Sequence, residues 1–341
     1  MLTVLARPIT LTWLWPMEIR LYRPDDDPAL MTLERLSPRG LPEPFVHYRQ
    51  RFIDRAALFS DHVLLVAENA GEVIGCVAAG LKRTHIGGEP VSLGYVFDVR
   101  THPARRRQGL GTALVVAMDD HLRELGMDGV YGHIVASNVP SLRLFAKLGY
   151  ERLRQLIMLF YQPMPAIMLP EWMPRHVPDP AAGQAGIQAV HAWRDLYVPD
   201  VADSLSAFGF ERWSIDLGGG RCAGLSLFDQ SYVFQQWPAD LPFPSAEEMR
   251  KRRQANLRLF DEVGIQHPDL LRALFDVLRD EAVVARVSKL SLLLDRTDRV
   301  PGFLFAEASQ QMDYWMVFKS LRRGWRPAWQ DGPIYIDTRE L

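Results

Sequence analysis

The stretch Val99–Ala113 reads VRTHPARRRQGLGTA and joins an apolar strand pattern to an amphipathic helix pattern. Three arginines, at positions 105–107, precede Gly109 and Gly111 where the helix is predicted to begin. A helix start carries unpaired backbone N–H groups and a partial positive charge, so anions bind there readily. Glycines let phosphates approach the backbone, and arginines add forked donors. The stretch therefore predicts a site for an anionic cofactor.

The spacing of these residues narrows the choice of cofactor. A Walker loop needs a lysine directly after its second glycine, which this sequence lacks. A Rossmann fingerprint needs a third glycine or alanine where Leu114 stands, so a dinucleotide oxidoreductase would rest on two glycines alone. The pattern that fits is Arg/Gln-x-x-Gly-x-Gly/Ala, met by Arg106, Gly109 and Gly111. Measurable binding of NAD would support the alternative of a dinucleotide oxidoreductase.

A second segment downstream agrees with the first. Apolar residues between 114 and 125 recur at helical spacing up to Gly126, and a strand pattern follows at 129–136. Residues 136–150 then read ASNVPSLRLFAKLGY, in which Asn138 is a predicted helix cap. The two segments, in this order, resemble the cofactor-binding motifs of the GNAT N-acetyltransferase superfamily. The resemblance covers residues 17–161.

The resemblance implies both a fold and a reaction. The fold is α/β (α+β), with a mixed, mostly antiparallel sheet flanked by helices. The reaction is the transfer of an acetyl group from acetyl-CoA to a primary amine of a small molecule or peptide, by direct attack on the thioester and without a metal. The residues that the resemblance assigns to acetyl-CoA are Val99, Thr101, Arg106, Arg107, Gln108, Gly109, Leu110, Gly111, Thr112, Asn138, Ser141 and Phe145.

The reaction also needs a group that removes a proton, because an alkyl amine with a pKa of about 10 is protonated at neutral pH. The candidates are Asp98, Tyr95 and His133, with His102 beside the loop. Strand alternation puts Asp98 on the face opposite Tyr95, unless a β-bulge resets the register. Packing is the alternative role for Tyr95, and a buried core position is the alternative for His133.

One residue departs from the superfamily pattern. The superfamily commonly has a tyrosine that protonates the leaving thiolate, and that position is Phe145 here. Phenylalanine cannot donate a proton. A non-catalytic module that senses acyl-CoA or a metabolite is therefore the alternative to an enzyme, and turnover with any amine distinguishes the two.

The length of 341 residues suits two domains. We expect an N-terminal tail at 1–16, the GNAT domain at 17–161, a proline-rich linker at 162–180 and a second α/β domain at 181–341. The second domain is either a degenerate GNAT copy or an unrelated fold, because the first motif does not recur in it. Ser245 to Glu248 forms a capping-box pattern that predicts a helix running to about Val263.

Composition limits the partners. A net charge of -2 argues against nucleic acid. Cys76 and Cys222 lie far apart, which favours free thiols and the cytoplasm. The apolar run in residues 1–16 is too short to span a membrane, and Met17 is the hypothesised native start. The second domain is expected to border the acceptor site or to build a homodimer.

Overall fold

The computed structural model describes residues 17–40, 44–166, 184–199, 201–205, 207–251, 255–263 and 266–340. The predicted tail at 1–16 and most of the predicted linker at 162–180 lie outside these residues. Both cysteines are free, Cys76 buried and Cys222 exposed. No helix in the described ranges is long and apolar enough to cross a membrane.

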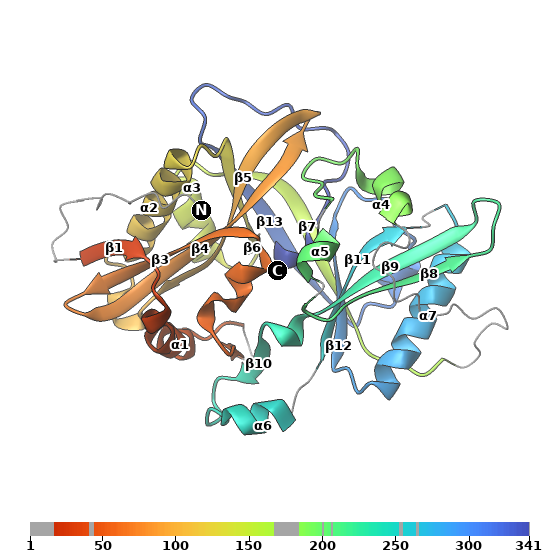
Figure 1. Ribbon diagram of the computed structural model, residues 1–341, viewed down its shortest axis with the longest axis horizontal. Coiled ribbons are helices and arrows are strands. Elements are labelled where there is room, and N and C mark those ends of the chain that lie inside the picture. The colour runs from red at the N-terminus through yellow and green to blue at the C-terminus, as the bar shows by residue number, and fades with distance from the viewer. Residues whose placement is uncertain are drawn as a thin grey trace.

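Eleven strands form one mixed, mostly antiparallel sheet in the order β1-β3-β4-β5-β6-β13-β7-β12-β11-β9-β8, and β10 pairs with β2 apart from it (Figure 1). The strands are β1 Met17–Leu21, β2 Phe45–Tyr48, β3 Asp61–Asn69, β4 Glu72–Ile86, β5 Glu89–Thr101, β6 Gly129–Val135, β7 Glu151–Tyr161, β8 Phe210–Asp216, β9 Cys222–Asp229, β10 Gln235–Pro238, β11 Asn256–Val263, β12 Lys289–Asp295 and β13 Gln310–Ser320. The α-helices are α1 Asp27–Leu36, α2 Leu110–Glu124, α3 Val139–Lys147, α4 Gln184–His191, α5 Val201–Leu205, α6 Ala246–Lys251, α7 Pro268–Val284 and α8 Phe303–Ala306. Short 3₁₀ helices are η1 Pro24–Asp26, η2 Phe52–Leu58, η3 Pro103–Arg105, η4 Gln230–Tyr232 and η5 Thr338–Glu340.

One predicted element is wrong. The capping box at Ser245 forms, since the Glu248 N–H donates to Ser245 Oγ at 3.2 Å and the Ser245 N–H donates to Glu248 Oε2 at 2.8 Å. The helix nevertheless ends at Lys251, and residues 256–263 form β11 instead of its continuation. β11 lies between β9 and β12 inside the sheet. Pairing on both sides therefore overrides the local helix signal.

The last strand of the chain lies in the middle of the sheet. β13 pairs antiparallel with β6 on one side and with β7 on the other, while β7 in turn pairs with β12 (Figure 1). A strand from the predicted second domain thus completes the sheet of the first half. The two halves share one continuous sheet across the boundary expected at 162–180.

Three hydrophobic cores fill the two faces of this sheet. Leu114 and Met118 of α2 pack over the first half, and Leu274 and Phe275 of α7 pack over the second half. The opposite face carries one core that both halves share, which we call the central core. Its members include Tyr95, Phe97, Phe228, Phe260 and Met316.

The second half repeats the order of the first. β5, α2 and β6 form a parallel β-α-β unit beside β4, and β11, α7 and β12 form another beside β9. Both β5 and β11 are interrupted by a register shift at an aspartate with positive φ, +49° at Asp98 and +53° at Asp261. The sequence carries the same signal, because Phe97-Asp98 and Phe260-Asp261 occupy matching places.

Candidate active site

The corner between β5 and α2 has the geometry of an anion site. Gly109 is the N-cap of α2 with φ +88°, a left-handed conformation that glycine adopts without a steric penalty. The Ala113 N–H donates to the Gly109 carbonyl at 3.0 Å, so the amides of residues 110–112 come before the helical ladder. Arg106, Arg107 and Gln108 are exposed around these amides. Phosphate oxygens could therefore meet backbone N–H groups and guanidinium groups together.

The loop before the helix is held by its own hydrogen bonds. The His102 Nδ1 accepts from the Ala104 N–H at 3.3 Å, and the Gln108 Nε2 donates to the Ala104 carbonyl at 3.2 Å. Leu110 anchors the far end, being only 5% exposed within the core under α2. This placement makes His102 a loop-ordering residue.

The second predicted segment meets the first at this corner. The Asn138 side chain caps α3 by accepting from the Ser141 N–H at 3.3 Å. A Cβ placed on Gly111 would lie 3.4 Å from the Leu144 Cδ2 and 3.8 Å from the Thr101 Cγ2. The end of β5, the start of α2 and α3 therefore converge here, as the two motifs predict.

β5 and β6 separate next to this corner. Their parallel pairing covers Leu93 to Tyr95 and ends opposite Tyr131. A Cβ on Gly132 would lie 2.9 Å from the Val96 carbonyl oxygen, so glycine keeps the strands close where they begin to diverge. The His133 side chain is fully buried although the residue as a whole is partly exposed, so its accessible atoms are backbone atoms. The strand edge beyond this point is open to an extended ligand.

Asp98 lies on the face that strand alternation argued against. The bulge turns its side chain onto the face of Phe97, over whose ring the Arg55 guanidinium lies at 4.6 Å. Val99 packs instead against the core under α2. The register thus changes within two residues, which is the exception that the sequence prediction allowed for.

Four arginines surround the buried Asp98 carboxylate. Its oxygens lie 2.8 Å from Arg39 Nη2, 2.7 Å from Arg49 Nη1, 2.9 Å from Arg55 Nη1 and 4.0 Å from Arg100 Nη2. Burial opposes ionisation, but the arginines outweigh it and hold the pKa of Asp98 well below its usual range. A carboxylate stabilised this strongly is a weak base. The geometry favours a role for Asp98 in holding the arginines.

Tyr95 and His133 lie close together where β5 and β6 begin to separate, with ring centroids 5.3 Å apart. The Tyr95 hydroxyl donates to the Glu340 carbonyl, and burial raises its pKa. Burial lowers the pKa of His133 to about 3, so its imidazole is neutral at pH 7. Within the part of the chain that the structure describes, neither ring nitrogen of His133 has a hydrogen-bond partner, and Nε2 lies 3.5 Å from Glu340 Oε2.

Sequence reasoning missed the group that faces His133. Glu340, from η5, is buried and forms an ion pair with Lys82, and it accepts a hydrogen bond from the Tyr131 hydroxyl. Burial raises the pKa of Glu340 to about 7. Asp337 Oδ2 lies 3.2 Å from the Lys82 Nζ. Lys82, which directly follows the apolar run from Val73 to Leu81 in β4, was the one local signal of a buried acid.

Phe145 belongs to the core. Its side chain is 4% exposed and packs edge-on against Tyr150 at a centroid distance of 4.8 Å. The Tyr150 hydroxyl donates to Asp119 Oδ1 at 2.6 Å. Phe145 therefore supports α3, and the nearby tyrosine hydroxyl is engaged elsewhere.

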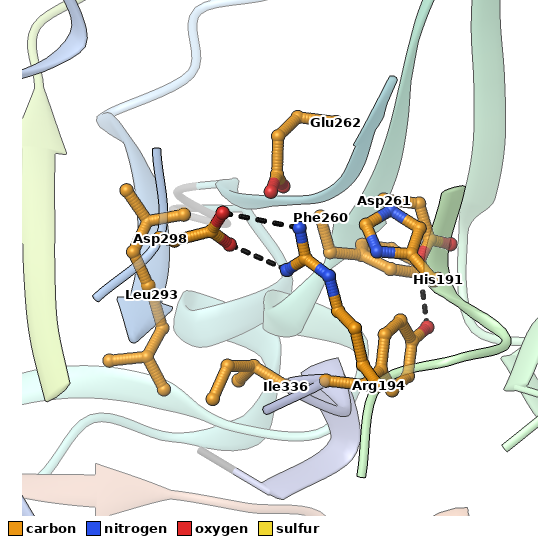
Figure 2. Close-up of a pocket in the computed structure, with 10 residues that line it drawn as sticks. His191, Arg194, Phe260, Asp261, Glu262, Leu293, Asp298 and Ile336 are labelled. Atoms are coloured by element: carbon orange, nitrogen blue, oxygen red, sulfur yellow. Dashed lines mark hydrogen bonds and ion pairs between the residues drawn. The ribbon is translucent and has the colours of Figure 1, made fainter. Parts of the chain in front are cut away.

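The matching place in the second half, beside β11 and β12, holds a small pocket whose lining side chains are drawn in Figure 2. The lining residues include Asp261, Glu262 and Leu293, and an Arg194–Asp298 ion pair with oxygen distances of 2.5 and 3.1 Å crosses the pocket. Burial raises the pKa of Asp261 to about 6 and of Glu262 to about 8.

The second half also has a shorter connection between strand and helix. β11 ends at Val263 and α7 begins at Pro268, whereas β5 ends at Thr101 and α2 begins at Leu110. Among the described residues, no group of three or more His, Cys, Asp or Glu is arranged to hold a metal ion.

Comparisons with known proteins fit this geometry. Residues 28–150 match the model of the acetyltransferase (GNAT) family. A mycothiol acetyltransferase of Saccharomonospora viridis is 33% identical over 105 residues, which are 30% of this chain and 34% of that protein. An acetyltransferase of Pectobacterium atrosepticum is 29% identical over 139 residues, covering 40% of this chain and 88% of its own length.

Some solved structures of similar fold extend over both halves of the chain. A tandem GNAT protein from the clavulanic acid biosynthesis pathway superposes with a TM-score of 0.56 at 14% identity, over 90% of this chain and 99% of its own. At this identity the likeness concerns the fold alone. It agrees with the repeat of β-α-β units described above. The chain matches only about a third of the length of the mycothiol acetyltransferase.

Proposed function

Because residues 28–150 form a domain of the GNAT acetyltransferase family, we propose that this protein transfers an acetyl group from acetyl-CoA to a primary amine. The observation that carries the proposal is the corner between β5 and α2. There a left-handed Gly109 opens the helix beside exposed arginines. The acceptor is a small molecule or peptide.

Acetyl-CoA supplies an activated thioester, and the chain's residues hold it at both ends. Backbone N–H groups of residues 109–112 and the Arg106 and Arg107 side chains bind the pyrophosphate. The strand edge from Val99 to Thr101 pairs with the pantetheine arm. A backbone N–H near Val99 then stabilises the charge that develops on the carbonyl oxygen during attack.

His133 and Glu340 are the proposed proton acceptor for the attacking amine. A general base works best when its pKa lies near the working pH, and the Glu340 pKa of about 7 meets this condition. Neutral His133 lies 3.5 Å from that carboxylate and passes the proton to it. Asp98 positions the arginines, and Tyr95 positions Glu340 through its carbonyl.

The leaving thiolate needs no tyrosine from α3. A thiol has a pKa of about 8.5, so a thiolate leaves far more readily than an amine would. Phe145, which cannot donate a proton, is therefore compatible with turnover. In the matching place the second half has only a small pocket crossed by the Arg194–Asp298 ion pair, so we assign it no acetyl-CoA site and propose that it borders the acceptor.

Calorimetric binding of acetyl-CoA tests the proposal directly. We expect wild type to bind, Gly109→Trp to lose binding, and NAD to give no signal. Gly302→Trp is the matched control, since an added Cβ at Gly302 meets nothing within 4 Å. Absence of acetyl-CoA binding to folded wild type would overturn the proposal.

Thiol release with a panel of amines separates an enzyme from the alternative that Phe145 suggests. That alternative is a module that binds acyl-CoA as a signal without turnover. Release above the hydrolysis background with any amine supports the enzyme. Tight binding without release from any amine supports the sensor.

A further inference from the structure

One buried arginine lies on the sheet face that carries the central core. Arg258, in β11, is 6% exposed, and its Nε and Nη1 atoms have no hydrogen-bond partner among the described residues. No carboxylate within the described ranges forms an ion pair with it. A buried charge without a partner is costly, so proteins retain one mainly where it binds something.

The Arg258 side chain lies on the central-core face of the sheet. It shares that face with Phe260, two residues on, and with Phe228, its neighbour across β9. The groups whose charges act on it are Tyr314, Arg55 and Tyr95. Arg258 therefore reaches from the second half toward the proposed reaction centre of the first.

The surroundings of Arg258 are positively charged. The arginine cluster contains two carboxylates, Asp98 and Glu34, of which Glu34 lies 2.5 Å from Arg100 and 3.4 Å from Arg49. Four arginines face these two carboxylates, and Arg258 lies within electrostatic reach of one of the four, Arg55. Together the five guanidinium groups and the two carboxylates carry a formal charge of three positive. The Arg39 side chain is 35% exposed, which connects the cluster to solvent.

The phosphates of acetyl-CoA do not account for this charge. They belong at the start of α2, whose Leu110 and Leu114 pack on the opposite face of the sheet. Arg258 lies on the central-core side, together with Tyr95 of the proposed reaction centre. A separate anion on the acceptor is the simplest partner.

We infer that the acceptor is an amine that also carries a carboxylate, as an amino acid does, and that Arg258 binds this carboxylate. The inference rests on the proposed function. A planar guanidinium pairs with a carboxylate through two parallel N–H···O bonds, and the neighbouring Tyr314 hydroxyl can donate a third. The amine then points toward Tyr95 and His133.

The test compares acceptors that differ in this one group. Thiol release from acetyl-CoA is measured with the twenty amino acids, with their amides and with the matching decarboxylated amines. For the best amino acid, we expect wild type to show kcat/KM roughly 10- to 150-fold above its amide, the range for a hydrogen bond to a charged group. Equal use of acid and amide, or preference for phosphoethanolamine over every amino acid, would overturn the inference.

Variants locate the effect. Arg258→Met should remove the preference by raising KM for the acid far more than KM for the amide. Arg258→Lys keeps the positive charge but cannot form two parallel hydrogen bonds to a carboxylate, so it should retain part of the preference for the acid. Arg299→Met, an exposed arginine in the same half, is the matched control and should behave as wild type. Equal loss for acid and amide in Arg258→Met would overturn the assignment.

The two proposals fail in different ways. Absence of acetyl-CoA binding, or of thiol release with every amine, counts against the proposed function. Turnover of amines without any preference for a carboxylate counts against this inference alone.

Discussion

Replacing Arg258 by methionine should stabilise the protein. Burial without a partner lowers the pKa of Arg258 from 12.5 to about 10. At roughly 1.4 kcal/mol for each pKa unit, the charged form is disfavoured by about 3 kcal/mol in the folded state. Because the folded pKa lies below the unfolded one, this penalty is complete at neutral pH and fades only as pH rises through 10.

Methionine occupies similar space and carries no charge, so Arg258→Met should recover about 1–3 kcal/mol of unfolding free energy. Urea unfolding followed by tryptophan fluorescence measures this as a higher midpoint at an unchanged slope. In a chain of 341 residues, the melting temperature should rise by about 1–2 °C per kcal/mol.

Arg55 provides the contrast. It is equally buried, but it pairs with Asp98 at 2.9 Å and donates to the Glu340 carbonyl at 3.3 Å. Arg55→Met leaves the Asp98 carboxylate and the Glu340 carbonyl without this donor, and should lower the free energy of unfolding by about 3–5 kcal/mol. The reasoning is refuted if Arg258→Met loses more than about 1 kcal/mol, or if the two variants behave alike.

Four further outcomes follow from the geometry. Gly109→Ala should lower stability by about 1 kcal/mol, because its φ of +88° strains any side chain, and should weaken acetyl-CoA binding in calorimetry. Asp98→Asn leaves four arginines without their shared carboxylate and should cost about 3–5 kcal/mol in urea unfolding; a loss below about 1 kcal/mol would contradict the cluster. The kcat/KM of wild type should rise with pH through about 7 as Glu340 ionises, and Glu340→Gln should lose that inflection in a pH series. Burial raises the Glu262 pKa from 4.5 to about 8, so the folded chain keeps a proton that the unfolded chain loses, and stability falls as pH rises through this window. Glu262→Gln should therefore be more stable than wild type by about 3 kcal/mol at pH 7 and equal to it at pH 4, as thermal melts at both values would reveal.

The features that the sequence determined by itself are local ones. Pro103, the arginines, Gly109 and the helical pattern after it lie within some twenty consecutive residues, so their geometry depends on backbone preferences that any reader of the sequence can apply. The Asn138 cap and the turn at Gly126, with φ +77°, follow from the same preferences. The match of residues 28–150 to the GNAT family model and the backbone geometry of the corner between β5 and α2 were therefore predictable.

The tertiary structure decided whatever depends on residues distant in the sequence. The capping box at Ser245 predicts a helix through residues 256–263. These residues form a strand instead, because β9 and β12 pair with them on either side. A β-bulge turns Asp98 toward Arg39, Arg49 and Arg55, and strand alternation alone does not determine where that bulge lies.

Long-range packing also created the two groups on which the proposals depend. Glu340 meets Lys82 across 258 residues, and its raised pKa comes from burial that no local pattern records. Arg258 has two nitrogens without a partner among the described residues because the sheet places it on the face of the central core, opposite Phe228. Burial and charge balance are sums over the whole fold, so only the folded chain determines which side chains can carry the chemistry.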